Sequence, residues 1–296
     1  MTAQAVIGIV GGSGLYELEG LTGQEWRRID SPFGRPSDDL MFGRLGETRV
    51  VFLPRHGRGH RIPPHEINYR ANIDALKRAG ATTVLSLSAV GSLRADRPPG
   101  TFVVVDQFID RTLRGPKSFF GTGLVAHVSM GHPVCRRAAR ALAEAGRALN
   151  LSIAEGGTYV VMEGPQFSTL AESELHRSWH ADVIGMTNMP EAKLAREAEL
   201  CYATVAMVTD FDCWHPDHDH VDVQQVIRLM QTNSANAKAL LRAVIPALGA
   251  HDGRCEAGCD RALEHAIMTA PAARDPEVCA KLDAVAGRVL VKGAAS

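Results

Sequence analysis

Short apolar runs alternate with amphipathic stretches along most of the chain, and this alternation predicts strands alternating with helices. Apolar runs of strand length occupy residues 5–10, 50–54, 82–88, 102–105, 157–163, 181–184 and 202–208. Apolar side chains at helical spacing predict helices over residues 68–79, 133–149 and 190–200, and a long helix from residue 222 to about residue 248. The pattern predicts an α/β fold, in which a ligand site forms where polar groups gather at the strand ends.

Residues 251–296 differ in composition from the rest of the chain. They are rich in Ala and are interrupted by Gly258, Pro271 and Pro276, which favours short helices joined by loops. We therefore expect a single α/β domain over residues 1–250 and a helical C-terminal tail, residues 251–296, packed on the same domain. A chain of 296 residues is long enough to bury the core that such a domain needs.

Composition and charge argue against several classes of protein. The chain is 45% hydrophobic and 22% charged with a net charge of -1, so no global field favours nucleic acid or a membrane surface. No apolar run reaches the roughly 18 residues of a spanning helix. The first apolar run continues into Gly11 and Gly12, which is unlike a signal peptide. We expect a cytoplasmic protein that binds neither nucleic acid nor membranes.

The Cys residues raise the question of disulfides or bound metal. The lack of a signal peptide pattern favours reduced thiols. Cys255 and Cys259 lie close together in the tail, but no further His or Cys pair at zinc spacing completes a site with them. The sequence therefore predicts no metal site.

Two carboxylates follow the apolar run at 202–208. If the chain stays extended, Asp210 and Asp212 point to the same side and Phe211 points to the other. Like charges at that spacing repel, so at least one carboxyl holds its proton more tightly than a free Asp does. Such a pair donates one hydrogen bond and accepts another. A solvated turn after the strand explains this stretch equally well.

Two other strand ends carry groups that suit an anion. The loop 11–14 contains three Gly residues and Ser13, whose hydroxyl and backbone N–H groups can converge on an anion. It lacks the dinucleotide fingerprint, because Glu17 stands where the last Gly is required. Arg55 and His56 follow the strand at 50–54. A tight turn and a basic surface loop are the alternatives for these two stretches.

Several segments in a fixed order carry a family resemblance: IGIVGGSGLY, LPRHGRGH, SAVGS, FIDRT, EGPQFST and GMTNMPEAKLAREAELCYATVAMVTDFDCW. Over roughly residues 5–248 the chain resembles the S-methyl-5'-thioadenosine phosphorylases, a branch of the purine nucleoside phosphorylase family, whereas the tail carries little of the resemblance. The resemblance implies a mixed central sheet, partly closed into a distorted barrel flanked by helices, and a homotrimer. It implies phosphorolysis of methylthioadenosine to adenine and 5-methylthioribose 1-phosphate in methionine and purine salvage. Inorganic phosphate is then a substrate, and no cofactor or metal is required.

The resemblance also assigns residues. Those that it places around phosphate are Ser13, Arg55, His56, Ser88, Ala89 and Thr187; Ser13 and Ser88 stand where Thr is common. Those that it places around the nucleoside are Met186 under the ribose, Phe167 stacked on the purine, and Ser168, Asp210 and Asp212 along the purine edge. It places Val223 and His127 at the 5' end of the substrate, with His127 reaching in from a neighbouring subunit.

The expected reaction explains why two acids are needed. Adenine leaves poorly as an anion, so protonation of its N7 helps the glycosidic bond to break. Asp210, kept protonated by burial and by Asp212, is the candidate acid. The pair also accepts hydrogen bonds from the 6-amino group, whereas an Asn would suit a 6-oxopurine. Phosphate, held by Arg55 and His56, attacks the sugar and stabilises its positive charge.

Other readings remain open at this stage. A nucleosidase would use water and would not need the cationic group at Arg55 and His56. Methylthioinosine or another purine nucleoside is an alternative substrate, and a non-catalytic nucleoside sensor is an alternative class of protein. Val223 fits a helix core as well as it fits a methylthio pocket. The run from His215 to His220 matches no standard zinc pattern and favours a solvated loop over the site.

Overall fold

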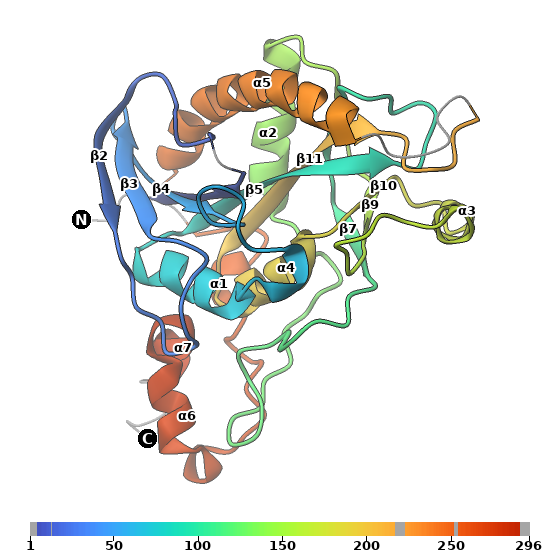
Figure 1. The fold of residues 1–296 in the computed structure, drawn as a ribbon. Coiled ribbons are helices and arrows are strands. Elements are labelled where there is room, and N and C mark those ends of the chain that lie inside the picture. Colours follow the sequence, from blue (N-terminus) through green and yellow to red (C-terminus); the bar gives the residue numbers. More distant parts are fainter. Residues whose placement is uncertain (1–4, 13, 217–222, 252–253, 291–296) are drawn as a thin grey trace.

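The computed structural model describes residues 5–12, 14–216, 223–251 and 254–290, and these form one mixed sheet covered by helices on both faces (Figure 1). Eleven strands belong to the sheet, whose main path runs β2-β3-β4-β1-β5-β10-β9-β7. The strands of this path are β2 (Leu21–Arg27), β3 (Leu40–Leu45), β4 (Thr48–Pro54), β1 (Val6–Gly11), β5 (Thr83–Ser92), β10 (Val183–Gly185), β9 (Thr158–Val161) and β7 (Gln107–Asp110). The three others are β6 (Phe102–Val104), β8 (Ile153–Glu155) and β11 (Cys201–Asp210).

The sheet branches at β5, which is why it curls. The first part of β5 pairs in parallel with β1 on one side and with β11 on the other. Its last two residues, Gly91 and Ser92, pair instead with β10 in the antiparallel sense. The sheet does not close, and this open curl agrees with the predicted distorted barrel.

Helices cover the two faces of the sheet and enclose two cores. On one face lie α2 (Arg136–Ala148) and α5 (Val223–Gly249), which pack against each other; on the other lie α1 (Tyr69–Arg78) and α4 (Asn188–Glu197) (Figure 1). Leu142 and Leu241 belong to the first core, and Leu76 and Leu194 to the second. Because both faces are covered, a central strand can be buried along almost its whole length, as β11 is.

The C-terminal tail packs on the same body. Its helices are α6 (Pro276–Lys281) and α7 (Asp283–Leu290), and α7 lies against α1. Leu282 and Val285 join the core beneath α1, and Arg78 pairs with Asp283 across the two helices. In Figure 1 the tail projects downward beside the loop that follows β7, and an isolated β-bridge between Ala126 and Ile267 is one of the contacts that join them.

The predicted elements are present with shifted ends, and several others were not predicted. The run at 82–88 is part of β5, which continues to Ser92, and the tail holds the expected two short helices. The unpredicted elements are β2, β3, β7, β8, α3 (Leu170–Ser178) and the short 3-10 turns Pro64–Glu66, Cys259–Arg261 and Pro271–Ala273. Within the described residues, no helix combines the length and apolar character needed to span a membrane.

Candidate active site

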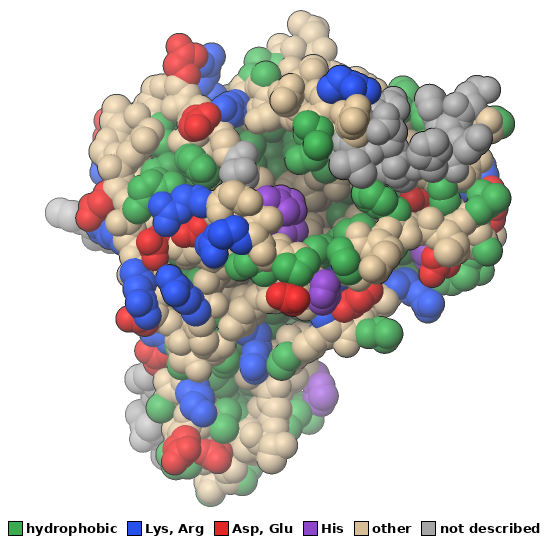
Figure 2. Space-filling view, viewed as in Figure 1, with side chains coloured by type: hydrophobic (Ala, Val, Ile, Leu, Met, Phe, Trp, Pro, Cys, Tyr) green, Lys and Arg blue, Asp and Glu red, His purple; other side chains and the backbone are tan. Residues whose placement is uncertain are grey.

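The carboxyl ends of the central strands meet at one end of the sheet. Gly11, the last residue of β1, pairs with Pro54 of β4, so the Gly-rich loop lies beside Arg55, whose backbone N–H donates to the Gly11 carbonyl at 3.0 Å. Asp210, the last residue of β11, pairs with Gly91 of β5. Figure 2 shows this face hollowed below α5, with His and hydrophobic side chains at the rim of the hollow.

Asp210 and Asp212 lie together, but not through extended geometry. The ladder between β11 and β5 shifts register between Val208 and Asp210, and Asp212 adopts the left-handed region with φ 53°. The expectation that the chain stays extended is therefore wrong. The pair forms instead through a turn in which the Asp212 backbone N–H donates to Oδ1 of Asp210 at 2.8 Å. Thr209 Oγ1 donates to the other Asp210 oxygen at 2.7 Å.

Both carboxyls hold protons more tightly than free Asp does. Burial raises the pKa of Asp210 to about 6, and the nearby charge of Asp212 adds to this rise. Burial also raises the pKa of Asp212, whose side chain is 4% exposed. The Ser173 and Ser168 hydroxyls lie close enough to this carboxyl to oppose that rise, although its Oδ2 atom has no well-formed hydrogen bond among the described residues. A buried carboxylate beside an easily protonated carboxyl is equipped to bind a polar ligand.

The space around the acid pair depends on a residue without a side chain. A Cβ placed on Gly91 would lie 2.8 Å from Oδ1 of Asp210 and 3.2 Å from the backbone nitrogen of Asp212. On the other side, the Ser168 carbonyl accepts a hydrogen bond from the Cys213 thiol at 3.4 Å. Ser168 is therefore brought next to the acid pair, and its contact with a purine stays a prediction.

Arg55 is buried and directed inward. Its Nε donates to Oε2 of Glu191 at 2.9 Å, and NH1 donates to the Leu87 carbonyl at 2.9 Å. NH2 contacts Ser86 Oγ at 2.6 Å, Oε1 of Glu191 at 3.2 Å and the Val10 carbonyl at 3.3 Å. A guanidinium has five N–H donors, so at most one hydrogen on NH1 remains for a ligand. The contact between Arg55 and phosphate stays a prediction, whereas the ion pair between Arg55 and Glu191 is observed.

Glu191 lies at the centre of a buried polar network that sequence reasoning missed. Its Oε1 accepts hydrogen bonds from Ser86 Oγ at 2.7 Å and from the Tyr202 hydroxyl at 2.9 Å. Asn188 Nδ2 donates to that hydroxyl and to Thr204 Oγ1, each at 2.7 Å. The available signal was a charged residue among apolar positions of α4, because a buried charge needs a partner.

His56 is neutral at ordinary pH. Burial, together with the nearby charge of Arg55, lowers its pKa to about 4. Its Nδ1 lies 2.8 Å from the Ile62 carbonyl, so in the neutral ring this nitrogen carries the hydrogen and donates it. Nε2 is then an acceptor, and the ring stacks on His60 with 4.2 Å between centroids. The geometry suits a protonated oxygen of a ligand such as monohydrogen phosphate.

Ser88, in the middle of β5, and Thr187, which follows β10, both lie beside the Tyr159 hydroxyl. Ser88 Oγ donates to Oδ1 of Asn188 at 3.2 Å and lies 3.4 Å from the Tyr159 hydroxyl. Thr187 precedes α4, and its Oγ1 is buried without a well-formed hydrogen bond among the described residues. Ala89 follows Ser88 on β5 and is half-buried. Two hydroxyls beside a helix N-terminus favour an anion.

Met186 is held in place by a buried cation from a distant loop. Arg114 NH1 donates to the Met186 carbonyl at 2.8 Å, and NH2 donates to the Glu163 carbonyl at 2.8 Å. Gly164 faces Met186 closely, since a Cβ on it would lie 2.5 Å from the Met186 sulfur. Arg114 was not singled out in the sequence, because only the folded chain brings it to these strand ends.

The other predicted residues are either exposed or outside the part of the chain that the structure describes. Phe167 is 47% exposed, so its ring is available to a ligand and is not packed in the core. His127 is exposed on the loop after β7, and its backbone N–H donates to the Ala266 carbonyl at 2.9 Å, which ties it to the tail. Ser13, the Val223 side chain and residues 217–220 lie outside what the structure describes.

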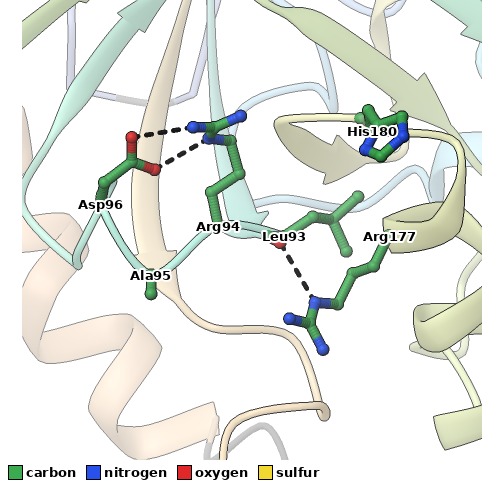
Figure 3. Close-up of a pocket in the computed structure, with 7 residues that line it drawn as sticks. Leu93, Arg94, Ala95, Asp96, Arg177 and His180 are labelled. Carbon is green, nitrogen blue, oxygen red and sulfur yellow. Dashed lines mark hydrogen bonds and ion pairs between the residues drawn. The ribbon is translucent and has the colours of Figure 1, made fainter.

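A second hollow does not coincide with these residues. A cavity of about 370 Å³ is lined by the segment after β5 and by the end of α3 (Figure 3). Its Arg94 pairs with Asp96 at 2.8 Å, and Arg177 Nε donates to the Leu93 carbonyl at 3.3 Å. None of the predicted site residues lines it, and these charged groups already have partners, so the acid pair remains the better candidate.

The interpretation of the cysteines is wrong in one respect. Within the described residues, the sulfur atoms of Cys135, Cys201, Cys255 and Cys259 all lie within 4.8 Å of one another. Two cysteines that are remote in sequence therefore complete a set of four with the pair in the tail. All four are buried at the opposite end of β11 from Asp210, because Cys201 is the first residue of that strand.

The comparisons with known proteins agree with one another. The model of a family described as the Phosphorylase superfamily matches residues 6–246. The chain is 58% identical to the S-methyl-5'-thioadenosine phosphorylase of Cereibacter sphaeroides, over 97% of this chain and 99% of that one. It is 60% identical to the protein of the same name from Bradyrhizobium diazoefficiens, with the same coverage. Because these alignments cover 97% of the chain, they include most of the tail, and the expectation that the tail carries little resemblance is wrong.

Solved structures are similar as well. A methylthioadenosine phosphorylase from an antarctic soil metagenomic library superposes with a TM-score of 0.90 at 44% identity, over 95% of this chain and 99% of that one. A methylthioadenosine phosphorylase from Schistosoma mansoni in complex with adenine gives a TM-score of 0.84 at 36% identity, over 89% and 99% of the two chains.

Proposed function

Because the chain belongs to the phosphorylase superfamily, we propose that it catalyses phosphorolysis of S-methyl-5'-thioadenosine to adenine and 5-methylthioribose 1-phosphate. It is then a pentosyltransferase of methionine and purine salvage. The observation that supports the purine half of this reaction is the acid pair, in which burial raises the pKa of Asp210 to about 6. The relatives that carry this activity in their names align over nearly the whole chain.

Asp210 acts as the general acid. Its protonated form donates to N7 of the purine, so that adenine leaves as a neutral molecule and not as an anion. The carboxylate of Asp212 accepts a hydrogen bond from the 6-amino group. A 6-oxopurine offers no hydrogen there, and the buried oxygen would stay unpaired at a cost of about 1–3 kcal/mol. Ser168 completes the purine edge, Phe167 stacks on the ring, and Met186 lies under the ribose.

Phosphate attacks C1' from the opposite side of the sugar. Ser13, Ser88, the Ala89 backbone and Thr187 hold its oxygens, and the place of Thr187 at the N-terminus of α4 supports this assignment. His56 accepts a hydrogen bond from a protonated phosphate oxygen through Nε2. Arg55 contributes its positive charge and its remaining N–H, while Glu191 fixes its direction. No cofactor enters these steps, because phosphate is itself the nucleophile.

Residues away from the acid pair form the pocket around the 5' end of the substrate. Val223 contacts the methylthio group, and His127 reaches in from a neighbouring chain. His127 is exposed on a loop tied to the tail, which supports a role at a contact between copies. We infer a homotrimer that acts in the cytoplasm, with nucleoside and phosphate as its partners and no role in binding nucleic acid or membranes.

The test is adenine release from methylthioadenosine with and without phosphate. We expect release that depends strictly on phosphate and yields a sugar 1-phosphate. Equal release without phosphate would identify a nucleosidase and would refute the assigned phosphate site. Adenosine and methylthioinosine, assayed in parallel, measure substrate choice, and methylthioinosine should be the poorest of the three. Binding of methylthioadenosine without turnover would instead favour a nucleoside sensor.

A further inference from the structure

The four buried cysteines come from three separate parts of the fold. Cys135 directly precedes α2, and Cys201 begins β11. Cys255 and Cys259 lie in the tail on either side of a tight turn, which the Gly258 N–H closes by donating to the Cys255 carbonyl at 2.8 Å. The first two are already neighbours, because the Cys135 N–H donates to the carbonyl of Tyr202, the residue after Cys201, at 2.7 Å.

The sulfur spacing matches a tetrahedron around one metal ion. Four thiolates at the usual Zn–S distance of about 2.3 Å lie about 3.8 Å from one another. The sulfurs of Cys135 and Cys255 are 3.7 Å apart, and all four lie within 4.8 Å of one another. A disulfide requires about 2.05 Å, and all four cysteines are free. A cluster of several irons would spread its thiolates farther apart, because they bind different metal atoms.

The surroundings suit thiolates that share a cation. The four side chains are between 0% and 5% exposed, so charged sulfurs there need a counter-charge. Cys135 also lies at the N-terminus of the thirteen-residue helix α2, where the helix dipole favours a negative charge.

We propose that Cys135, Cys201, Cys255 and Cys259 bind one Zn²⁺ ion in a closed structural site. Binding replaces four S–H bonds with four Zn–S bonds and releases the protons to solvent. Four protein ligands leave no open position for water or substrate, so the site is not catalytic. Its effect is to fasten the start of the tail to the junction of α2 and β11.

The site is remote from the chemistry. Cys201 and Asp210 are the two ends of β11, and a ten-residue strand at about 3.3 Å per residue spans roughly 30 Å. Metal content and stability therefore test the proposal without reference to turnover, and its failure leaves the proposed reaction untouched.

The first measurement is metal analysis of protein purified without chelators. We expect about one zinc per chain in the wild type and in Cys279→Ser, a matched control because Cys279 lies outside the cluster. Cys255→Ser and Cys259→Ser should lose most of the zinc and unfold at lower temperature. If these variants do not fold, stepwise titration of the wild-type thiols with a mercurial should release zinc in proportion to the thiols modified.

Other outcomes would overturn the proposal. Zinc-free protein with four titratable cluster thiols would mean that the cysteines are simply buried. A mass about 4 Da below that of the reduced chain would mean two disulfides. Iron in place of zinc would identify a different metal centre.

Discussion

Arg55 and Glu191 form an ion pair inside the protein, with 2.9 Å between Nε and Oε2 and both side chains 2% exposed. They are 136 residues apart in sequence, and the pair joins the end of β4 to α4. Removing one partner of a buried pair leaves the other charge uncompensated, which costs far more than the pair gains over an apolar replacement.

Glu191→Gln should therefore weaken both the fold and the phosphate site. We expect the free energy of unfolding to fall by about 3–5 kcal/mol, measured by urea denaturation, and the KM for phosphate to rise more than the KM for the nucleoside. Glu174→Gln is the control, because Glu174 is a half-exposed partner of Arg177 on α3. A change in stability no larger than in this control would contradict the role assigned to the pair.

Asp210→Asn should remove the general acid and the pH dependence that it causes. We expect kcat/KM for methylthioadenosine to fall roughly 10²- to 10⁴-fold. In the wild type, kcat/KM should decline as pH rises through about 6, because the acid form of Asp210 is lost there. That break should be absent from the variant. An identical break in both proteins would assign it to another group.

The same carboxyl links stability to pH. The pKa of Asp210 is raised from 3.8 to about 6 on folding, so the folded state holds this proton more tightly. The stabilisation is complete below the unfolded value and is lost as pH rises through about 6. Relative to the wild type, Asp210→Asn should thus gain stability as pH rises across this window, measured by urea denaturation at several pH values.

His56 should show the opposite sign. Burial lowers its pKa from 6.5 to about 4, so the unfolded state binds the proton more tightly. Its contribution to stability is lost as pH falls from about 6.5 to about 4. His56→Gln should lose less stability than the wild type over that range in urea denaturation. It should also raise the KM for phosphate, and an unchanged KM would remove His56 from the phosphate site.

Gly91→Ala should disturb the acid pair without altering charge. The added Cβ would lie 2.8 Å from Oδ1 of Asp210, which forces the carboxylate or the following turn to move. Moving a catalytic group by about 1 Å costs roughly 10²-fold in rate. We expect a fall of that order in kcat/KM for methylthioadenosine. Gly115→Ala is the control, since its Cβ would meet no atom within 4 Å. Equal rates in the two variants would show that the turn adapts.

His127→Ala tests the contact between copies. By light scattering we expect a trimer, with three times the chain mass of 31.8 kDa. In the variant, the KM for methylthioadenosine should rise while the KM for phosphate stays constant. A fully active monomer would refute the trimer and the assignment of His127 together.

The sequence was sufficient for the elements whose pattern is strong. β11 was predicted because its apolar run is continuous, and α1 because its apolar face is regular and ends at Gly80. By contrast, β2 is largely exposed and carries no apolar run, and β8 has only three residues. Short or exposed edge strands give no periodic signal, since their pairing partners and not their own side chains define them.

For the candidate site, the sequence can propose members, but it cannot supply the geometry that joins them. The approach of Asp210 and Asp212 depends on a left-handed backbone at Asp212, which alternation along a strand does not reveal. The bond between Arg55 and Glu191 and the meeting of Cys135 with Cys255 join positions more than a hundred residues apart. Such pairs arise from topology, and no local spacing encodes them.

β11 is buried along nine of its ten residues, and the tenth is Asp210. The strand is held by β5 on one side and by β6 on the other, so the interior of the protein sets the position of the acid. The catalytic rate should then depend on how well the interior around β11 is packed. Truncating Val205 in mid-strand would leave a cavity beneath β11. Turnover should then fall in a fold that still forms.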